Sequence, residues 1–464
     1  MSGNTDILHI IVNPVAGHGK ASEFTDGTIV PILQHLSIPY QIHTTSSPGN
    51  AGMIGRNIIS KQNTNVYKVA IVGGDGTFHE FIEGVNELQG IRWEVILLPF
   101  GTANALFSSL FPPLSSSENS SRISTYQSIF DKLPTKLDEE NQYQLSSLLS
   151  YLSKSSPICL PITQTVLSSS SANANNNGED NGENILSHVV LSTSLHASIL
   201  NDSEALRSTH PGVERFKIAA KQNSSKLFHA NVSLHPSNND EIVEQWDPRE
   251  SKWVKPFTSI NNDNASSPKE IKNAININGP FSYFLSTSSV DRLEPSFVIS
   301  PLTSLRQKQE DNDNQHIYVT IIRPLRDPLI TSAKTEDRKE KTSNRAFEVI
   351  GNAYSNGNHV NLTYPAYKFS KNEENKTDDE AEGEKYSLEV KGEGEPVVEV
   401  YRCSSFEWIP VDIADNDKKE NEGLDIGNSN LVCADGAIHS IPADGTARVR
   451  LEDRKEGQGF YVYA

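Results

Sequence analysis

Short apolar runs alternate with polar, glycine-bearing turns over the first hundred residues of the chain. Runs of this kind predict strands of a parallel sheet, because both faces of such a sheet are buried. The expected strands are Ile7–Val12, Tyr40–His43, Val69–Val72 and Trp93–Pro99. Behind the third run, apolar residues recur at i, i+3, i+4 and i+7, which predicts an amphipathic helix with one buried face formed by Phe78, Phe81, Ile82 and Val85.

The second half of the chain shows a different pattern, in which strand-like runs are separated by hydrophilic segments. This predicts an antiparallel β domain with extended loops. The expected strands are Ala230–Leu234, Phe281–Ser286, Ile317–Ile322, His359–Leu362 and Val397–Tyr401. The expected loops are Ser259–Lys272, Gln307–Gln315, Lys334–Asn344 and Lys371–Glu384. The last apolar stretch, Gly459–Tyr463, is expected to return to the first domain as an edge strand.

The two patterns predict an α/β protein of two domains joined by a polar insertion. Residues 1–112 form the α/β domain, 113–186 the partly disordered insertion, 187–450 the antiparallel β domain, and 451–464 one or more closing strands. Residues 168–184 are rich in Ser, Asn and Gly and have almost no apolar side chains, so they are expected to be disordered. A helix is expected within the insertion over Tyr143–Ser153.

Composition narrows the class of protein. The chain has 464 residues, 36% of them apolar, and a net charge of −18, which argues against a general nucleic-acid binder. Its three cysteines are widely spaced, so neither a disulfide framework nor a zinc site is expected. The sequence contains no apolar run long enough to span a bilayer and no N-terminal signal segment, which predicts an intracellular protein.

The third apolar run ends in the turn Gly73–Thr77. Glycines let backbone N–H groups approach a phosphate, and the following helix offers unpaired donors at its N-terminus. Asp75 changes this picture, because a carboxylate repels phosphate; it fits a site where it holds Mg²⁺ or accepts a proton from a hydroxyl nucleophile. Thr77 and Glu80 have the spacing of a capping box. The same residues also fit an ordinary turn in which Asp75 is a turn former.

Polar turns also follow the other three runs. Asn13–Lys20 carries two glycines but is not a Walker A loop, since no Ser or Thr follows Lys20. It fits an ordinary strand-to-helix loop equally well. The second run ends at Thr44 and Thr45, and the fourth leads into Pro99–Ala105. Ligands of open α/β sheets bind at the carboxyl ends of strands, so these turns are expected to share one crevice.

Taken together, the turns resemble those of a family of lipid kinases. Gly73–Thr77 is similar to the Gly-Gly-Asp-Gly-Thr signature of diacylglycerol, sphingosine and ceramide kinases, which NAD kinases and phosphofructokinases share. Asn13–Lys20 resembles the turn that opens the lipid kinase domain, and Pro99–Ala105 resembles the Pro-x-Gly-Thr/Ser-x-Asn segment of the diacylglycerol and sphingosine kinases. NAD kinases have a different segment at this last place. The resemblance implies a Rossmann-like domain that binds ATP and Mg²⁺, followed by a β-sandwich with a lipid pocket.

The resemblance also implies roles for single residues. Asp75 would accept the proton of the lipid hydroxyl and hold the metal. The nucleotide would contact residues of the four turns, namely Asn13, Thr45, Gly73, Gly74, Gly76, Thr77, Gly101, Thr102 and Asn104. Arg207 and Arg215 lie in a segment similar to the Ser-Glu-x-x-Arg and Arg-Phe of sphingosine kinases, where they would neutralise the γ-phosphate. Both arginines also fit a solvated helix face.

Two positions depart from the family pattern. Asp435 and Gly436 match an Asp-Gly-Glu motif, which would place Asp435 near the metal and the phosphates, but Ala437 replaces the Glu. Leu200 stands where sphingosine kinases carry the Asp that reads the substrate amine. An unpaired ammonium in a buried pocket costs several kcal/mol. Either a nearby carboxylate such as Asp202 replaces that Asp, or the head group of the substrate is uncharged.

These observations predict an ATP-dependent lipid kinase acting on a sphingoid base, a diacylglycerol or a ceramide, with a slight preference for the neutral lipids. We expect a cytoplasmic protein that makes peripheral contact with intracellular membranes and has no nucleic-acid partner. The alternative is a catalytically inactive protein that binds nucleotide or lipid in a regulatory role. Ala437 and Leu200 motivate this alternative, whereas the complete Gly73–Thr77 turn favours the enzyme.

Overall fold

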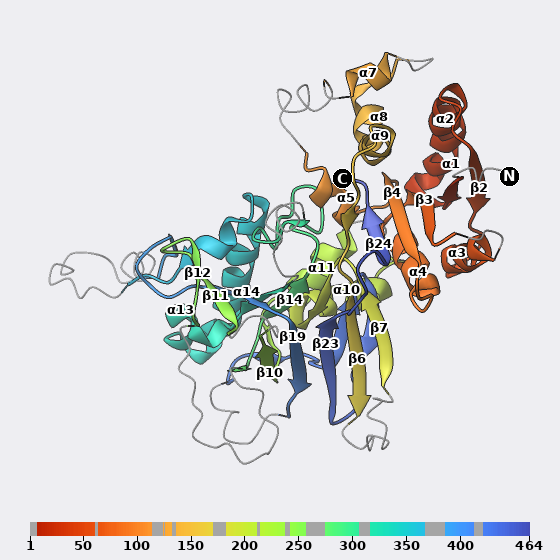
Figure 1. Cartoon of the computed structure of the whole chain (residues 1–464). Coiled ribbons are helices and arrows are strands. Elements are labelled where there is room, and N and C mark those ends of the chain that lie inside the picture. The colour runs from red at the N-terminus through yellow and green to blue at the C-terminus, as the bar shows by residue number, and fades with distance from the viewer. Residues whose placement is uncertain are drawn as a thin grey trace.

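The computed structural model describes residues 7–60, 64–113, 124, 126–131, 136–169, 182–210, 214–236, 242–256, 274–305, 316–366, 386–412 and 421–464. An α/β half built on a mostly parallel sheet lies beside a half built on two antiparallel sheets (Figure 1). The mixed α/β architecture predicted from the sequence is therefore confirmed.

The first sheet has six strands in the order β2-β1-β3-β4-β24-β5. Its members are β2 (Tyr40–Thr44), β1 (Leu8–Val12), β3 (Val66–Gly73), β4 (Arg92–Pro99), β24 (Gly459–Val462) and β5 (Ile158–Cys159). All neighbours are parallel except β5, which pairs antiparallel with β24. The chain's C-terminal strand does return to this sheet, but it lies inside the edge formed by β5 rather than at the edge itself.

Helices cover both faces of this sheet, because alternate residues of its strands point to opposite sides. One face, with Ile71 and Val95, packs on α3 (Asn50–Ile59), α4 (Asp75–Val85) and α5 (Ala105–Leu110). The other face, with Ala70 and Ile96, packs on a second group of helices. These are α1 (Lys20–Phe24), the π-helix η2 (Thr25–Ile29), α2 (Val30–His35) and α9 (Ser146–Leu152). Short helices complete this half: η1 (Ala16–Gly19), α7 (Gln127–Phe130) and α8 (Glu139–Gln144).

The second half contains a six-stranded and an eight-stranded antiparallel sheet. The first runs in the order β13 (Ile275–Asn278), β10 (Ala230–His235), β19 (Ser405–Pro410), β23 (Gly445–Leu451), β6 (Thr163–Ser169) and β7 (Glu183–Ser187). The second runs in the order β12 (Lys252–Val254), β11 (Glu244–Asp247), β18 (Val398–Cys403), β15 (Ile317–Ile322), β14 (Tyr283–Thr287), β8 (Leu191–Thr193), β21 (Leu431–Ala434) and β22 (Ala437–Ser440).

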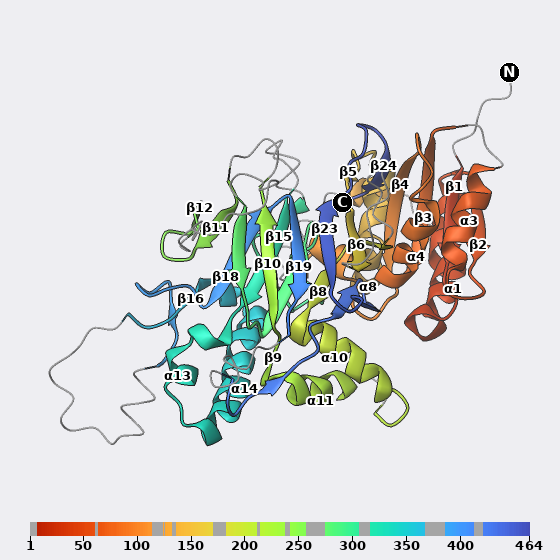
Figure 2. The same cartoon turned by 90° about the horizontal axis from the view of Figure 1, so that it is seen from below.

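The two antiparallel sheets face each other across one apolar core. Trp408 and Phe406 of the six-stranded sheet and Phe284 and Tyr401 of the eight-stranded sheet are buried in it. The opposite face of the eight-stranded sheet belongs to a second core, which α14 (Thr335–Gly351) covers and which continues into α4 of the first half. Figure 2 shows α10 (Ser194–Ala205) and α11 (Glu214–Asn223) lying side by side below these sheets.

The remaining elements are small. Two pairs of short strands join β16 (Leu362–Thr363) to β17 (Glu389–Val390), and β20 (Asp425–Ile426) to β9 (Lys226–Leu227). The short helices of this half are η3 (Pro324–Arg326), α13 (Pro328–Thr331), η4 (Asn352–Tyr354) and η5 (Asn358–Asn361). No helix among the described residues is both long enough and apolar enough to pass through a bilayer.

Two sequence predictions about local structure are wrong. The hydrophilic segment 334–344 is not a loop, because it forms most of α14, which buries Thr342, Arg345 and Val349 among its charged residues. The predicted strand 359–362 begins as the 3₁₀-helix η5.

Well-formed strands flank the polar segment 168–184, which the sequence predicts to be disordered. Strands β6 and β7 pair up to Leu167 and Glu183, so the predicted disordered segment begins and ends in ordered sheet. Its middle, 170–181, lies outside the described residues, as do the predicted loops 259–272, 307–315 and 371–384. The helix predicted over 143–153 is present as the end of α8 and the whole of α9.

Candidate active site

The carboxyl ends of the first four strands lie along one edge of the parallel sheet. Val12 pairs with Thr44 on one side and with Val72 on the other, and Gly73 pairs with Pro99. The predicted turns therefore all begin at this edge, as expected for strands that run in the same direction. The shared crevice inferred from the sequence is consistent with this register.

Two of the turns touch through their glycines. A Cβ atom on Gly74 would lie 2.6 Å from Gly101 Cα, and one on Gly101 would lie 2.4 Å from Gly74 Cα. Neither distance is tolerable for a real side chain, so only glycine permits this approach. The contact joins the start of α4 to the turn after β4.

Asp75 is the first residue of α4 and also binds the N-terminus of α5. Its Oδ2 accepts the backbone N–H of Ala105 at 2.8 Å, and its Oδ1 accepts that of Leu106 at 3.2 Å. Loss of hydration raises the pKa of Asp75 above its ordinary value, although the charge of His188 and the two N–H donors oppose this shift. A small cleft lies beside the carboxylate and is also lined by Gly73, Phe78 and Asn104, among others.

Most of the other predicted turn residues form hydrogen bonds that hold the turns in place at the carboxyl edge of the parallel sheet. Asn13 donates from Nδ2 to Thr77 Oγ1 at 2.9 Å. Asn104 has a left-handed backbone and binds both the N–H and the carbonyl of Gly101 through its side-chain amide. Thr45 is buried, and its N–H donates to the carbonyl that ends β1. Gly76 and Thr102 are exposed at the rim of the turns.

The capping box expected for α4 is not formed. The helix begins one residue after Gly74, which acts as N-cap without a side-chain hydrogen bond. Thr77 is thus already within the first turn, and its hydroxyl accepts the bond from Asn13 instead of capping the helix. The spacing of Thr77 and Glu80 matched the motif, but the glycine approach moves the helix start upstream.

Asp435 lies in the turn between β21 and β22, and its carboxylate is enclosed by donors. Its oxygens accept the backbone N–H groups of His188, Val189 and Val190 at 2.8–2.9 Å. His188 Nδ1 lies 2.6 Å and His79 Nδ1 3.0 Å from its Oδ2. Burial opposes ionisation, but the two histidines hold the pKa of the Asp435 carboxyl well below its usual range.

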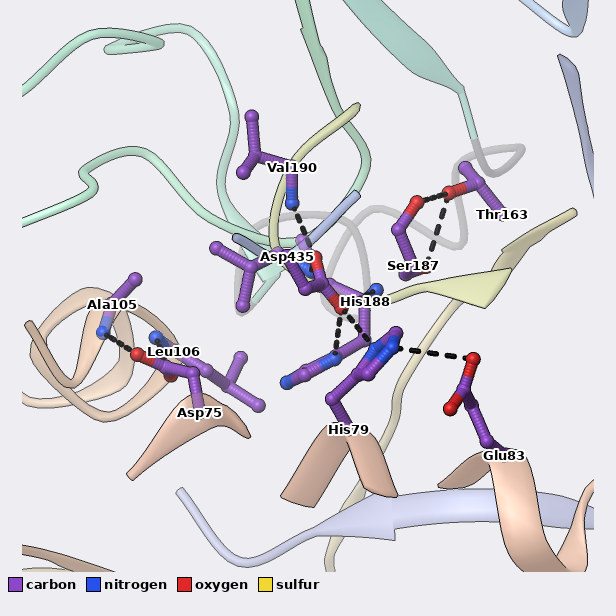
Figure 3. Close-up of polar contacts among 12 residues, drawn as sticks. Asp75, His79, Glu83, Ala105, Leu106, Thr163, Ser187, His188, Val190 and Asp435 are labelled. Atoms are coloured by element: carbon purple, nitrogen blue, oxygen red, sulfur yellow. Dashed lines mark hydrogen bonds and ion pairs between the residues drawn. The ribbon is translucent and has the colours of Figure 1, made fainter. Parts of the chain in front are cut away.

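The group formed by His79, His188 and Asp435 joins the two halves of the protein (Figure 3). His79 comes from α4, whereas the other two residues come from the antiparallel half. Burial alone would lower the pKa of His79, but the hydrogen bond and charge of Asp435 together with the charge of Glu83 raise it. Sequence reasoning missed both histidines, since they lie far apart in the chain and belong to none of the motifs; His79 was identifiable only as a polar residue amid the buried face of α4.

The carboxylates of the site differ in their fit to a divalent cation. Potential ligand atoms of His79, His188 and Asp435 lie within 4.8 Å of one another. However, the Asp435 oxygens already accept five N–H groups or close histidine contacts, so Asp435 does not fit a Mg²⁺ ion, which prefers oxygen ligands. Asp75 is only half-buried and uses one acceptor position on each oxygen, so it fits the role of a single carboxylate ligand.

The two arginines predicted to bind phosphate lie near the same carboxylate, that of Glu204. Arg207 follows the end of α10, and Arg215 is the second residue of α11. Arg207 is 63% exposed and binds Glu204 at 2.6 Å. Arg215 is largely buried, lies 3.8 Å from the same carboxylate and stacks on Phe216. The contacts of both arginines among the described residues are with Glu204 and Phe216, and their role at the phosphates stays a prediction.

The two residues predicted to read the substrate head group also lie on α10. Leu200 is half-buried. The oxygens of Asp202 accept the side-chain amide N–H groups of Asn201 at 2.9 Å and Asn223 at 2.8 Å. Asp202 therefore already ties α10 to α11.

Comparison with known proteins identifies the first domain. Residues 7–133 match the model of the diacylglycerol kinase catalytic domain, which confirms the family resemblance for this segment. Sphingosine kinase 1 of Rattus norvegicus is 26% identical over 106 residues, which are 22% of this chain and 27% of the rat protein. Sphingoid long chain base kinase 4 of Schizosaccharomyces pombe is 28% identical over 100 residues, 21% of each chain.

The curated relatives cover the chain only in part. Each matched segment spans less than a third of the length of the relative. Among solved structures, a diacylglycerol kinase from Bacillus anthracis aligns with 100% of this chain and 98% of its own, at 11% identity and a TM-score of 0.46.

Proposed function

We propose that this protein is an ATP-dependent lipid kinase, which transfers the γ-phosphate of ATP to the hydroxyl of a sphingoid base, a diacylglycerol or a ceramide. The observation that carries the proposal is the position of Asp75. Its carboxylate lies at the carboxyl edge of a parallel sheet, at the point where two glycine turns meet, in a segment that matches a lipid kinase catalytic domain.

In this proposal the turns at the sheet edge bind the nucleotide. The phosphates lie over Gly73, Gly74, Gly76, Gly101 and Thr102, whose glycines let a phosphate come close to the backbone. Asn13, Thr45, Thr77 and Asn104 complete the nucleotide site. The side chains of Asn13, Thr77 and Asn104 are held by one another or by the backbone before any ligand arrives, which reduces the cost of ordering them.

Asp75 has two proposed tasks. It accepts the proton of the lipid hydroxyl while the new O–P bond forms and the bond between the γ-phosphorus and the bridging oxygen breaks, which releases ADP. It also offers one carboxylate ligand to a Mg²⁺ ion, which would neutralise phosphate charge when bound. The raised pKa of Asp75 suits the first task, because a carboxylate that is less stable as an anion takes up a proton more readily.

We assign lipid binding to the antiparallel half, residues 187–450, with residues 1–112 as the nucleotide domain. Peripheral contact with intracellular membranes from the cytoplasm follows from a lipid substrate that resides in a bilayer. A nucleic-acid partner is not expected for a chain with a net charge of −18.

A second candidate is an inactive regulatory protein that binds nucleotide or lipid. Three observations favour it: Ala437 replaces an expected carboxylate, Asp435 is enclosed by N–H donors, and Arg207 and Arg215 pair with Glu204. The intact arrangement around Asp75 favours the enzyme.

The deciding experiment incubates the purified full-length chain with γ-labelled ATP, Mg²⁺ and a panel of lipids in mixed micelles. The panel contains sphingosine, diacylglycerol and ceramide. Label in one lipid product, absent with the Asp75→Asn variant, supports the kinase. Binding of ATP without labelled lipid from any member of the panel would instead support the inactive protein.

A further inference from the structure

The imidazole ring of His188 lies between two carboxylates of different function. On one side, Nδ1 is 2.6 Å from Asp435 Oδ2 in a fully buried pair. On the other side, Nε2 is buried and has no hydrogen-bond partner among the described residues. Figure 3 shows that this end of the ring points from Asp435 toward Asp75. The attraction between His188 and Asp75 also opposes the rise in the pKa of Asp75.

The surroundings hold the ring in this direction. The backbone N–H groups of residues 188–190 all bind Asp435, so the main chain that carries the ring is anchored. Phe78 packs edge-on against the ring with 4.9 Å between the ring centroids. The same Phe78 lines the cleft beside Asp75, which places the free end of His188 next to that cleft.

A buried, unpartnered ring nitrogen requires an explanation, because such atoms are nearly always paired in folded proteins. No residue that the structure describes forms a hydrogen bond with Nε2. His188 immediately follows β7 and thus belongs to the half assigned to lipid binding, whereas Asp75 belongs to the half assigned to the nucleotide. A group presented by the lipid would therefore enter between them.

We propose that His188 Nε2 hydrogen-bonds the acceptor hydroxyl of the lipid and holds it against Asp75. A hydroxyl both donates and accepts hydrogen bonds, so it can pair with Nε2 whether or not this nitrogen carries a proton. Asp435 then acts as a positioning residue: it fixes the ring through Nδ1 and leaves Nε2 for substrate. This assignment rests on the proposed lipid kinase function and adds a contact from the opposite side of the site.

A binding experiment tests the contact without turnover. Dioctanoylglycerol and sphingosine are each compared with an analogue in which hydrogen replaces the acceptor hydroxyl, using the full-length protein with a non-hydrolysable ATP analogue. The wild type should bind at least one of the two lipids about 3–10-fold more tightly than the analogue that lacks the hydroxyl. This is the difference in affinity that one hydrogen bond typically produces. His188→Asn should remove this preference, because Asn can reach Asp435 but not the cleft. Absence of the preference in the wild type, or its survival in His188→Asn, overturns the proposal.

Kinetics supply the second readout and a matched control. His188→Asn should lower kcat/KM for the lipid by about 10–100-fold while leaving the KM for ATP unchanged, since a misplaced nucleophile reacts slowly. His188→Gln, whose longer amide reaches toward the cleft, should recover part of the loss. His79→Asn is the control, because His79 also contacts Asp435 but directs its other nitrogen to Glu83 at 3.3 Å.

The control separates substrate contact from structural support. Equal losses in His79→Asn and His188→Asn, or no recovery in His188→Gln, would show that the histidines serve only the joint between the two halves. If the wild type is inactive on every lipid, the proposed kinase activity fails, and the binding comparison still decides whether His188 contacts a lipid alcohol.

Discussion

The sheet edge around Asp75 and the group around Asp435 are both built from a carboxylate and backbone N–H donors, yet they differ in their openness. Asp75 accepts two N–H groups and faces a cleft, and its pKa is raised. Asp435 accepts three N–H groups, meets two histidines and has a lowered pKa. The difference shows that a carboxylate with vacant acceptor positions is suited to chemistry, whereas an enclosed one holds elements together.

The largest effect is expected from a change of the open carboxylate, that of Asp75. Asp75→Asn should lower turnover by about 10²–10⁴-fold, the range for loss of a general base, while ATP still binds. Steady-state kinetics with the lipid found in the panel assay and a separate ATP-binding measurement provide the test. A variant that turns over like the wild type would remove Asp75 from the mechanism.

Removal of the enclosed carboxylate, that of Asp435, should lower the stability of the folded protein. Asp435→Ala leaves three backbone N–H groups and two histidines without their acceptor, so the free energy of unfolding should fall by about 3–5 kcal/mol. Urea denaturation measures this change, with Asp435→Asn as the control that keeps one acceptor oxygen. A loss below about 1 kcal/mol combined with abolished turnover would show that Asp435 acts as a catalytic or metal-binding group instead.

A third prediction concerns how the protein discriminates between lipid substrates. Leu200→Asp should raise activity on sphingosine relative to diacylglycerol by about 10–100-fold, because an added ion pair changes discrimination by about 1–3 kcal/mol. Competition between the two lipids in mixed micelles measures the ratio, and Leu200→Asn controls for polarity without charge. If the wild type already prefers sphingosine and Asp202→Ala abolishes that preference, Asp202 reads the amine.

The smallest expected effect is a pH dependence of the stability that the group of His79, His188 and Asp435 gives to the folded protein. The pKa of His79 is raised above its ordinary 6.5, so its protonated form stabilises the folded protein below that pH. This contribution is lost as the pH rises through the raised pKa. The stability difference between wild type and His79→Asn should thus be about 1 kcal/mol in mildly acidic buffer and shrink in alkaline buffer. Thermal unfolding across this range checks the sign; a difference that grows with pH would contradict it.

The two regions also differ in how far the sequence predicts them. Gly73–Thr77 and Pro99–Ala105 are contiguous motifs at strand ends, so their position at one sheet edge follows from the direction of the strands. Residues 79, 188 and 435 meet only through the packing of α4 against the antiparallel half, and no local pattern encodes that contact. Tertiary packing likewise made a helix of the charged segment 334–344, since α14 gains its stability from a buried face that includes Val349.

The arginines illustrate the limit of motif transfer. Arg207 and Arg215 occur in the order expected from the family, but Arg207 follows the end of α10 and Arg215 lies in α11, so they belong to different parts of the structure. Their shared partner is Glu204. The order of these residues in the sequence resembles that of the family, but it does not determine which tertiary contacts each arginine makes.

The position of β24 has a consequence for the order of folding during synthesis. This strand is held on one side by β4 and on the other by β5, and hydroxyls of α9 bind the carbonyls of Tyr463 and Ala464. Nearly the whole chain must leave the ribosome before residues 459–462 can fill the gap between β4 and β5. The nascent α/β half thus presents an unpaired strand edge while the antiparallel half is being made, and such an edge is a template for aggregation. The exposure of this edge thus ends only when residues 459–462 pair with β4 and β5.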